Sequence, residues 1–168
     1  MEPTVADPQP GLVPPQTLLQ ESGLDLLRGI IAGRHPAPPF ALTTRCFLVE
    51  AEEGRAVFKG TPDPAFFNPL GSIHGGWTAG IMDSAMACAI HTLLKAGQGY
   101  TTLEFRVHLV RAVMPRSGEL FCEGRIVHRG GQVATSEGYL RDAAGKLYAH
   151  GTETCLIFDA AARAKPPG

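Results

Sequence analysis

Alternation of hydrophobic and polar residues with period two dominates the second half of the chain and predicts β-strands there. The strand-like runs cover residues 101–113, 120–128, 132–141 and 147–158, with short turns rich in glycine, proline and aspartate between them. Two earlier runs, one beginning at Phe40 and one over residues 56–59, also predict strands. Since consecutive strands joined by short turns pair antiparallel, we predict one antiparallel sheet of five to six strands.

Two segments show a helical pattern instead. The first covers residues 22–32, where Ser22 is the capping residue, an apolar stripe follows, and Gly33 ends the helix. The second begins at Gly75, runs to about Lys95, and is apolar or small on nearly every side. Because a helix with that composition must be buried, the sheet has to curl around it, which predicts an α+β fold.

The chain of 168 residues is long enough to form one domain with its own core. We assign residues 1–38 to an N-terminal extension, 39–160 to the main domain and 161–168 to a flexible tail. Within the extension, residues 1–16 contain five prolines and no periodic pattern, which predicts a disordered lead before the short helix. That helix is a flap or interface piece on one interpretation and simple cover for the core on another.

Composition and charge narrow the classes of function. A net charge of −1 offers no electrostatic basis for binding nucleic acid or an anionic membrane. The most apolar segment, residues 77–94, is interrupted by Asp83, Ser84 and His91, so it does not predict a membrane span. The four cysteines are scattered and the six histidines lack ligand spacing, which predicts reduced core thiols in a cytoplasmic protein and no metal centre.

The candidate chemistry concentrates in residues 68–83, around the predicted start of the long helix. Asp83 has no lysine or arginine at helical spacing, and an unpaired carboxylate among small and apolar neighbours indicates use in a reaction. Gly75 opens the helix, where backbone N–H groups lack internal partners and suit an oxyanion. His74 and Asn68 precede it, and their side chains can hold a ligand, a water or the loop itself.

Gly75 and Asp83 are eight residues apart in the sequence. On a helix this spacing corresponds to about 12 Å along the axis, which an aspartate side chain cannot span. If both residues act on one substrate, Asp83 must therefore come from a second copy of the chain. The spacing predicts a two-fold dimer with two equivalent shared sites.

The combination Asn68-x5-His74-Gly75-Gly76-x6-Asp83, followed by a strand that begins Thr101-Thr102-Leu103-Glu104, resembles the hotdog-fold acyl-CoA thioesterases of the phenylacetate-degradation (PaaI-like) type. Further similar segments lie at residues 111–115, 118–120, 127–131 and 147–151, so the resemblance covers roughly residues 40–158. It implies a hotdog sheet wrapped around the long helix, edge-to-edge dimers, and the pairing of such dimers into tetramers.

The resemblance also implies a role for each residue of the motif. At the position of Asp83 the family activates water or attacks the thioester carbonyl, and the sequence leaves both routes open. The Gly75 N–H donates to the carbonyl oxygen, and Asn68 and His74 help to place the thioester and the water. Thr102 contributes a hydroxyl, with Thr101 as the alternative because the link after the helix varies in length.

The substrate implied by the resemblance is a coenzyme A thioester, and no resident cofactor is required. Candidate contacts for its phosphates are a basic turn and one further arginine: His128, Arg129, Gly130, Gly131, Gln132 and Arg116. Candidate contacts for the acyl group, unless they belong to the core, are Phe66, Phe67, Trp77, Met82 and Met86. The alternative function is a non-catalytic acyl-CoA-binding hotdog protein, and a hotdog dehydratase fits less well because its motifs are missing.

Overall fold

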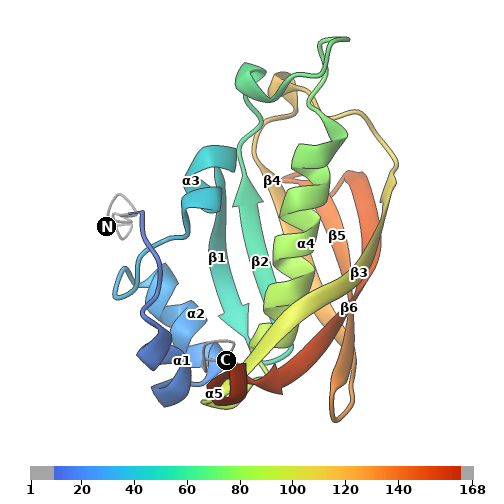
Figure 1. Cartoon of the computed structure of the whole chain (residues 1–168). Helices are drawn as coiled ribbons and strands as arrows, with labels where there is room; N and C mark the ends of the chain where they lie inside the picture. Colours follow the sequence, from blue (N-terminus) through green and yellow to red (C-terminus); the bar gives the residue numbers. More distant parts are fainter. Residues whose placement is uncertain (1–9, 164–168) are drawn as a thin grey trace.

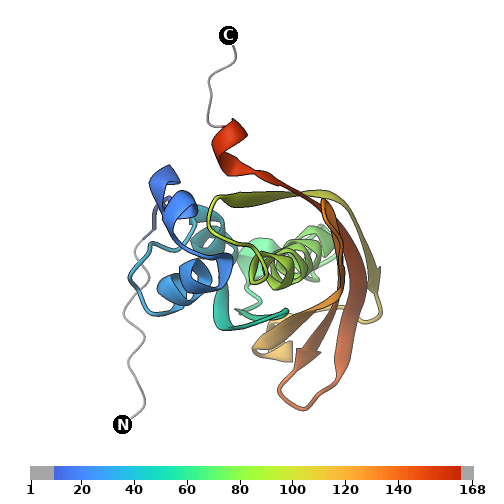
Figure 2. The ribbon, with the colours of Figure 1, turned by 90° about the horizontal axis from the view of Figure 1, so that it is seen from below.

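One six-stranded antiparallel sheet curls around a single long helix, α4 (Gly75–His91), in the computed structural model, which describes residues 10–163 (Figure 1). The strand order is β1-β2-β4-β5-β6-β3. Figure 2 looks nearly along α4 and shows the sheet passing around it on one side while the N-terminal helices cover the other. The predicted α+β hotdog architecture is confirmed. The strands are β1 (Cys46–Glu52), β2 (Arg55–Gly60), β3 (Gln98–Leu109), β4 (Leu120–Arg129), β5 (Val133–Asp142) and β6 (Leu147–Asp159).

Three short helices precede the sheet: α1 (Pro15–Gln20), α2 (Gly23–Ile31) and α3 (Pro39–Thr44). α2 is the helix predicted over residues 22–32, and the Ser22 hydroxyl accepts a hydrogen bond from the Asp25 N–H as its N-cap. Leu26 and Leu27 are buried in one cluster with residues of β1. α2 therefore covers the core beside the first edge of the sheet.

The predicted disordered lead (residues 1–16) and flexible tail (161–168) fall partly outside the described residues. Where the structure describes them, both are folded: α1 begins at Pro15, and α5 (Ala160–Arg163) occupies the start of the tail. Near the two ends, the Gly11 N–H donates to the Ala37 carbonyl, just before α3, and the Ala160 N–H donates to the Gly97 carbonyl, just before β3.

The predicted strand beginning at Phe40 is wrong over its first residues, which form α3, and the regular strand begins only at Cys46. Pro39 occupies the first turn of α3, where a proline is favoured because its missing N–H has no helical partner. Arg45 ends the helix in the left-handed conformation, with φ of 54°. The Trp77 indole donates to the Thr44 carbonyl at 2.8 Å, which fixes α3 against α4.

The long helix and the strand after it are both shorter than predicted. α4 ends at His91 because the Thr92 hydroxyl donates to the Ala89 carbonyl and accepts from the Gly54 N–H, which takes the place of further helical turns. β3 ends at Leu109, where the N–H groups of the next two residues both turn to the Tyr148 carbonyl. No helix in the described chain has the length and apolar character needed to cross a membrane.

α4 packs so closely on the inner face of the sheet that the strands carry glycine there. A Cβ built at Gly124 of β4 would lie 2.1 Å from the Ala85 carbonyl oxygen, and one at Gly138 of β5 would lie 2.7 Å from Met86 Cγ. Ala85 and Met86 are fully buried. The sheet thus touches the backbone of α4 directly and fixes the middle of the helix, where Asp83 lies.

Gly124→Ala is expected to lower the free energy of unfolding by about 1–3 kcal/mol, because the added methyl group meets helix backbone rather than a movable side chain. Urea denaturation followed by circular dichroism measures this change. Gly131→Ala is the matched control, since no atom lies within 4 Å of a Cβ built there, and its effect should stay within about 0.5 kcal/mol. Equal losses in the two variants would contradict the close packing.

Candidate active site

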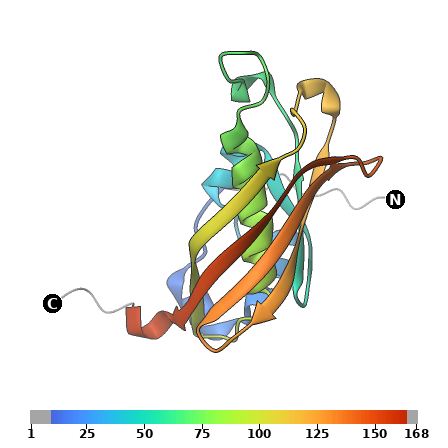
Figure 3. The same cartoon turned by 90° about the vertical axis from the view of Figure 1, so that its right-hand side faces the viewer.

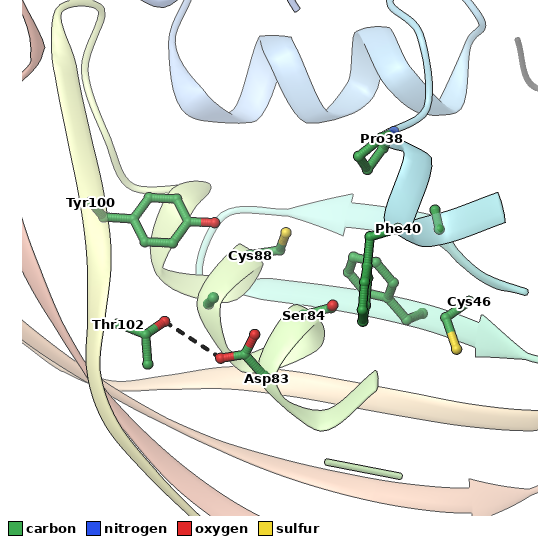
Figure 4. A pocket seen from close by; sticks show the side chains of 11 residues that line it. Pro38, Phe40, Cys46, Asp83, Ser84, Cys88, Tyr100 and Thr102 are labelled. Carbon is green, nitrogen blue, oxygen red and sulfur yellow. Dashed lines mark hydrogen bonds between the residues drawn. The ribbon is translucent and has the colours of Figure 1, made fainter. Parts of the chain in front are cut away.

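Asp83 lies in the middle of α4, with its side chain turned toward β3 (Figure 4). The Thr102 hydroxyl donates to Asp83 Oδ1 over a long 3.5 Å, and Asp83 is half-buried. Burial raises the pKa of Asp83 above its ordinary value, and the Thr102 hydrogen bond opposes that shift. Among residues 10–163, Asp83 takes part in no ion pair, as its sequence neighbours predicted.

A cavity of about 250 Å³ opens beside Asp83, between α3, α4 and β3. Phe40 and Tyr100 supply aromatic walls, and the small side chains of Ser84 and Ala87 leave space along α4 (Figure 4). Ser84 and Ala87 of α4 therefore border this cavity, and Gly80 of the same helix lies against Phe40 of α3. A mainly apolar cavity with one carboxylate suits a ligand that joins an apolar group to one reactive polar group.

The predicted acyl contacts do not line this cavity. Met82 and Met86 are fully buried in the core, and the Trp77 ring stacks on Phe66 with 6.2 Å between ring centroids. The core interpretation, which the sequence left open, therefore holds for these four side chains. An aromatic wall comes instead from Phe40, which α3 brings over the helix.

The start of α4 offers hydrogen-bond donors to an oxygen atom. His74 is the N-cap, and its Nδ1 accepts a hydrogen bond from the Gly76 N–H at 2.9 Å. A neutral His74 consequently carries its proton on Nε2, which makes that nitrogen a donor. Within the described chain the Gly75 N–H has no acceptor, so it remains available at the positive end of the helix dipole.

Asn68 is committed to its own loop. Its Oδ1 accepts from the Leu70 and Ser72 N–H groups, and its Nδ2 donates to the Ser72 hydroxyl at 2.8 Å. The His74 N–H donates to the Phe66 carbonyl, so this loop also fixes the residue that caps α4. The structure thus connects Asn68 to the helix start through the backbone of the loop, while its predicted contact with a thioester stays a prediction.

The predicted phosphate contacts lie at opposite ends of β4. His128 and Arg129 are the last two residues of β4, and Gly130, Gly131 and Gln132 form the turn to β5. Arg116 is exposed in the single turn Pro115–Ser117 before β4. The ten residues of β4 separate the two by about 30 Å. Within one chain they cannot flank the same site.

Sequence reasoning missed Glu153, which lies directly behind Thr102. Only 2% of Glu153 is exposed, and its Oε1 accepts hydrogen bonds from the Thr102 hydroxyl at 2.7 Å and from Cys155 Sγ at 3.2 Å. Burial, together with the negative charge of Asp83, raises the pKa of Glu153 to about 7. The signal was present in β6, where Glu153 alternates in phase with Ala149 and Cys155, both inward-facing core residues.

A bulge in β3 sets the direction of Thr102. The pairing with β6 shifts between Thr102 and Glu104, which leaves Leu103 as an extra residue. Simple alternation would turn Glu104 inward along with Thr102. After the bulge the phase is inverted, so Val107 packs on the core and Glu104 faces outward.

Comparisons with known proteins agree with this fold. The family model described as the thioesterase superfamily matches residues 70–149, which include Gly75, Asp83 and Thr102. A phenylacetic acid degradation-related protein from Ralstonia eutropha JMP134 is 26% identical, with a TM-score of 0.70 over 77% of this chain and 98% of that one. A conserved protein from Pseudomonas aeruginosa is 25% identical, with a TM-score of 0.68 over 73% of this chain and 95% of that one.

The PaaI protein from the phenylacetic acid degradation operon of E. coli is 20% identical, with a TM-score of 0.64 over 71% of this chain and 83% of that one, and shows likeness of fold alone. A search of curated proteins found no match.

Proposed function

We propose that this chain, a hotdog-fold thioesterase of the PaaI-like type, hydrolyses acyl-CoA thioesters to a free acid and coenzyme A. The observation that carries the proposal is the unpaired Asp83 carboxylate at a mainly apolar cavity, on the same helix whose first N–H is available. A carboxylate in such surroundings suits a base or a nucleophile, and the N–H suits a carbonyl oxygen that becomes negative. The proposed reaction needs no resident cofactor.

Two routes use these groups. In the first, Asp83 takes a proton from a water whose oxygen attacks the thioester carbon, and the Gly75 N–H stabilises the oxyanion. When the carbon–sulfur bond breaks, coenzyme A leaves as a thiolate and the proton on Asp83 passes to sulfur or solvent. In the second, Asp83 attacks the carbon itself, the thiolate leaves, and water hydrolyses the resulting anhydride.

The proposed site is shared by two protomers, since Gly75 and Asp83 of one α4 are about 12 Å apart along its axis. β3 is an edge strand of the sheet (Figure 3). It exposes large apolar side chains that are unusual on a free edge, with exposed fractions of 57% for Leu103, 44% for Phe105 and 58% for Leu109. Such an edge supports pairing with a second copy.

Contacts along β3 support one register for this dimer. Thr102 marks the level of Asp83, and Leu109 marks the level of Gly75, because a Cβ built at Gly75 would lie 3.1 Å from Leu109 Cδ1. A two-fold axis between residues 105 and 106 would set Thr102 of one antiparallel β3 opposite Leu109 of the other. Asp83 of one protomer then lies at the level of Gly75 in its partner.

The same dimer would reconcile the two groups of predicted phosphate contacts. Arg116 lies toward the Gly75 end of the domain, because the nearby Val113 carbonyl accepts from the Ile73 N–H. The turn over residues 128–132 lies beyond Thr102, where Arg129 donates to Gln98. If one site combines the Gly75 end of one protomer with the Asp83 region of the other, Arg116 and this turn come from different protomers.

A panel of aromatic and straight-chain acyl-CoA esters tests the proposed function. We expect thiol release with at least one class, followed with a thiol reagent, and calorimetric binding of the same esters. Binding without thiol release from any ester would support the non-catalytic acyl-CoA-binding alternative. Absence of both thiol release and binding would reject acyl-CoA as the ligand.

A further inference from the structure

Thr102 stands between two carboxyl groups and has only one proton to give. Its hydroxyl oxygen lies 2.7 Å from Glu153 Oε1 and 3.5 Å from Asp83 Oδ1. A hydroxyl donates one hydrogen bond and accepts through its lone pairs. If both carboxyls are ionised, Thr102 serves only one of them, and two negative charges face each other across it.

The burial of Glu153 makes its ionised form the unfavourable one. Its Oε2 is buried and has no hydrogen-bond partner within the described chain. No ion pair of the described residues includes Glu153. Burying an ionised carboxylate that lacks a partner costs free energy. A neutral Glu153 avoids the cost of a buried charge, and its proton can form a hydrogen bond with a neighbour.

We propose, building on the function above, that Glu153 holds a proton in the active enzyme and donates it in a hydrogen bond to Thr102, so that the Thr102 hydroxyl donates to Asp83. Glu153 is then a positioning residue: it does not touch the substrate, and it fixes the direction of the Thr102 hydroxyl, which contacts the reacting carboxylate. The proton stays on Glu153 throughout, so no bond is made or broken there.

The groups around Glu153 are consistent with a neutral acid. α4 contributes Asp83 and Cys88, β3 contributes Tyr100, and β6 contributes Cys155. Each of these groups is either negative or neutral, so none of them supplies a positive charge that would stabilise an ionised Glu153. From β5 the paired residue is Ser136, whose hydroxyl donates to the Met86 carbonyl. The His91 ring contacts Tyr100, and burial lowers the His91 pKa to about 4, so it is uncharged at neutral pH.

The Glu153 pKa of about 7 places the loss of this proton within the working range of pH. Above that value Glu153 becomes an acceptor, Thr102 turns to it, and Asp83 loses its hydrogen bond. The inference therefore predicts that kcat declines as pH rises through about 7. Below that pH the arrangement is intact as long as Asp83 is ionised.

Glu153→Gln tests this directly, because its amide NH₂ donates at any pH. We expect a kcat within about threefold of the wild type at pH 6 and loss of the decline near pH 7. Glu153→Leu removes the donor and should lower kcat by about ten- to a hundredfold, the range for a hydrogen bond to a charged group, with little change in KM. Glu137→Gln, on the outer face of β5, is the matched control and should keep the wild-type profile.

An infrared titration gives a readout that does not depend on turnover. The difference spectrum between wild type and Glu153→Gln should contain the carbonyl band of a protonated acid at pH 6, and this band should decline as pH rises through about 7. Absence of the band at pH 6, or an unchanged kcat profile in Glu153→Gln, would overturn the inference. Lack of acyl-CoA hydrolysis by the wild type would instead reject the proposed function and leave the infrared result valid.

Discussion

Replacing Asp83 with asparagine is expected to lower kcat for acyl-CoA hydrolysis by at least about a hundredfold, the usual scale for loss of a general base. Asparagine has the same shape and can still accept from Thr102, but it neither takes a proton at neutral pH nor attacks a carbonyl. The expected loss therefore lies in the chemical step, and KM should change little. Steady-state thiol release with the best ester of the panel measures both quantities.

Folding measurements separate a catalytic from a structural role for Asp83. Because burial raises the pKa of Asp83 in the folded protein, its contribution to stability is greatest below the ordinary aspartate pKa and is lost as pH rises through the raised value. Asp83→Asn stays neutral and should be at least as stable as the wild type at pH 7. Asp25→Asn, at the exposed start of α2, is a control that should leave turnover unchanged. An Asp83→Asn variant that unfolds, or that keeps its turnover, would contradict the catalytic role of Asp83.

The long helix shows why part of this site could be predicted from sequence. A segment that is small or apolar on every side has to be buried, and a lone aspartate within it has to be explained by function. The structure confirms the burial of the helix, since Ala85 and Met86 are fully buried, and it places Asp83 at the cavity with Thr102 beside it. Thr102, rather than Thr101, is the residue that contacts the carboxylate.

The elements that could not be predicted depend on contacts distant in sequence. Residues 40–44 alternate like a strand, and only the prolines before them and the Trp77 bond to Thr44 favour a helix. Because the cavity wall includes Phe40, misassigning this segment also misplaced the predicted acyl contacts. Glu153 was missed for a similar reason. A charged residue in an alternating strand is normally assigned to the outward face until its register with β3 is known.

Replacing Gly75 with proline is expected to lower kcat by about a hundred- to a thousandfold, the effect of removing one oxyanion donor. Gly75 is the first residue of α4, the position where proline is tolerated, so the substitution removes the N–H and little else. His74 has φ of −59° and ψ of 137°, a conformation compatible with a following proline. Gly75→Ala is the control: it keeps the N–H, and its methyl meets only the movable end of Leu109. Equal activities of the alanine and proline variants would exclude this N–H from the reaction.

Combining the two inactive variants tests whether the site is shared. Chains carrying Asp83→Asn and Gly75→Pro, coexpressed with different affinity tags and purified through both, form mixed dimers. If Gly75 of one protomer works with Asp83 of the other, each mixed dimer holds one site with both groups intact and one with neither, so activity should return to about half of the wild-type value per dimer. If one chain supplied both residues, each site would lack one group and the mixed dimer would stay as inactive as its parents. Because each parent is expected to keep about 1% of the wild-type turnover or less, the two arrangements differ by far more than the error of the assay.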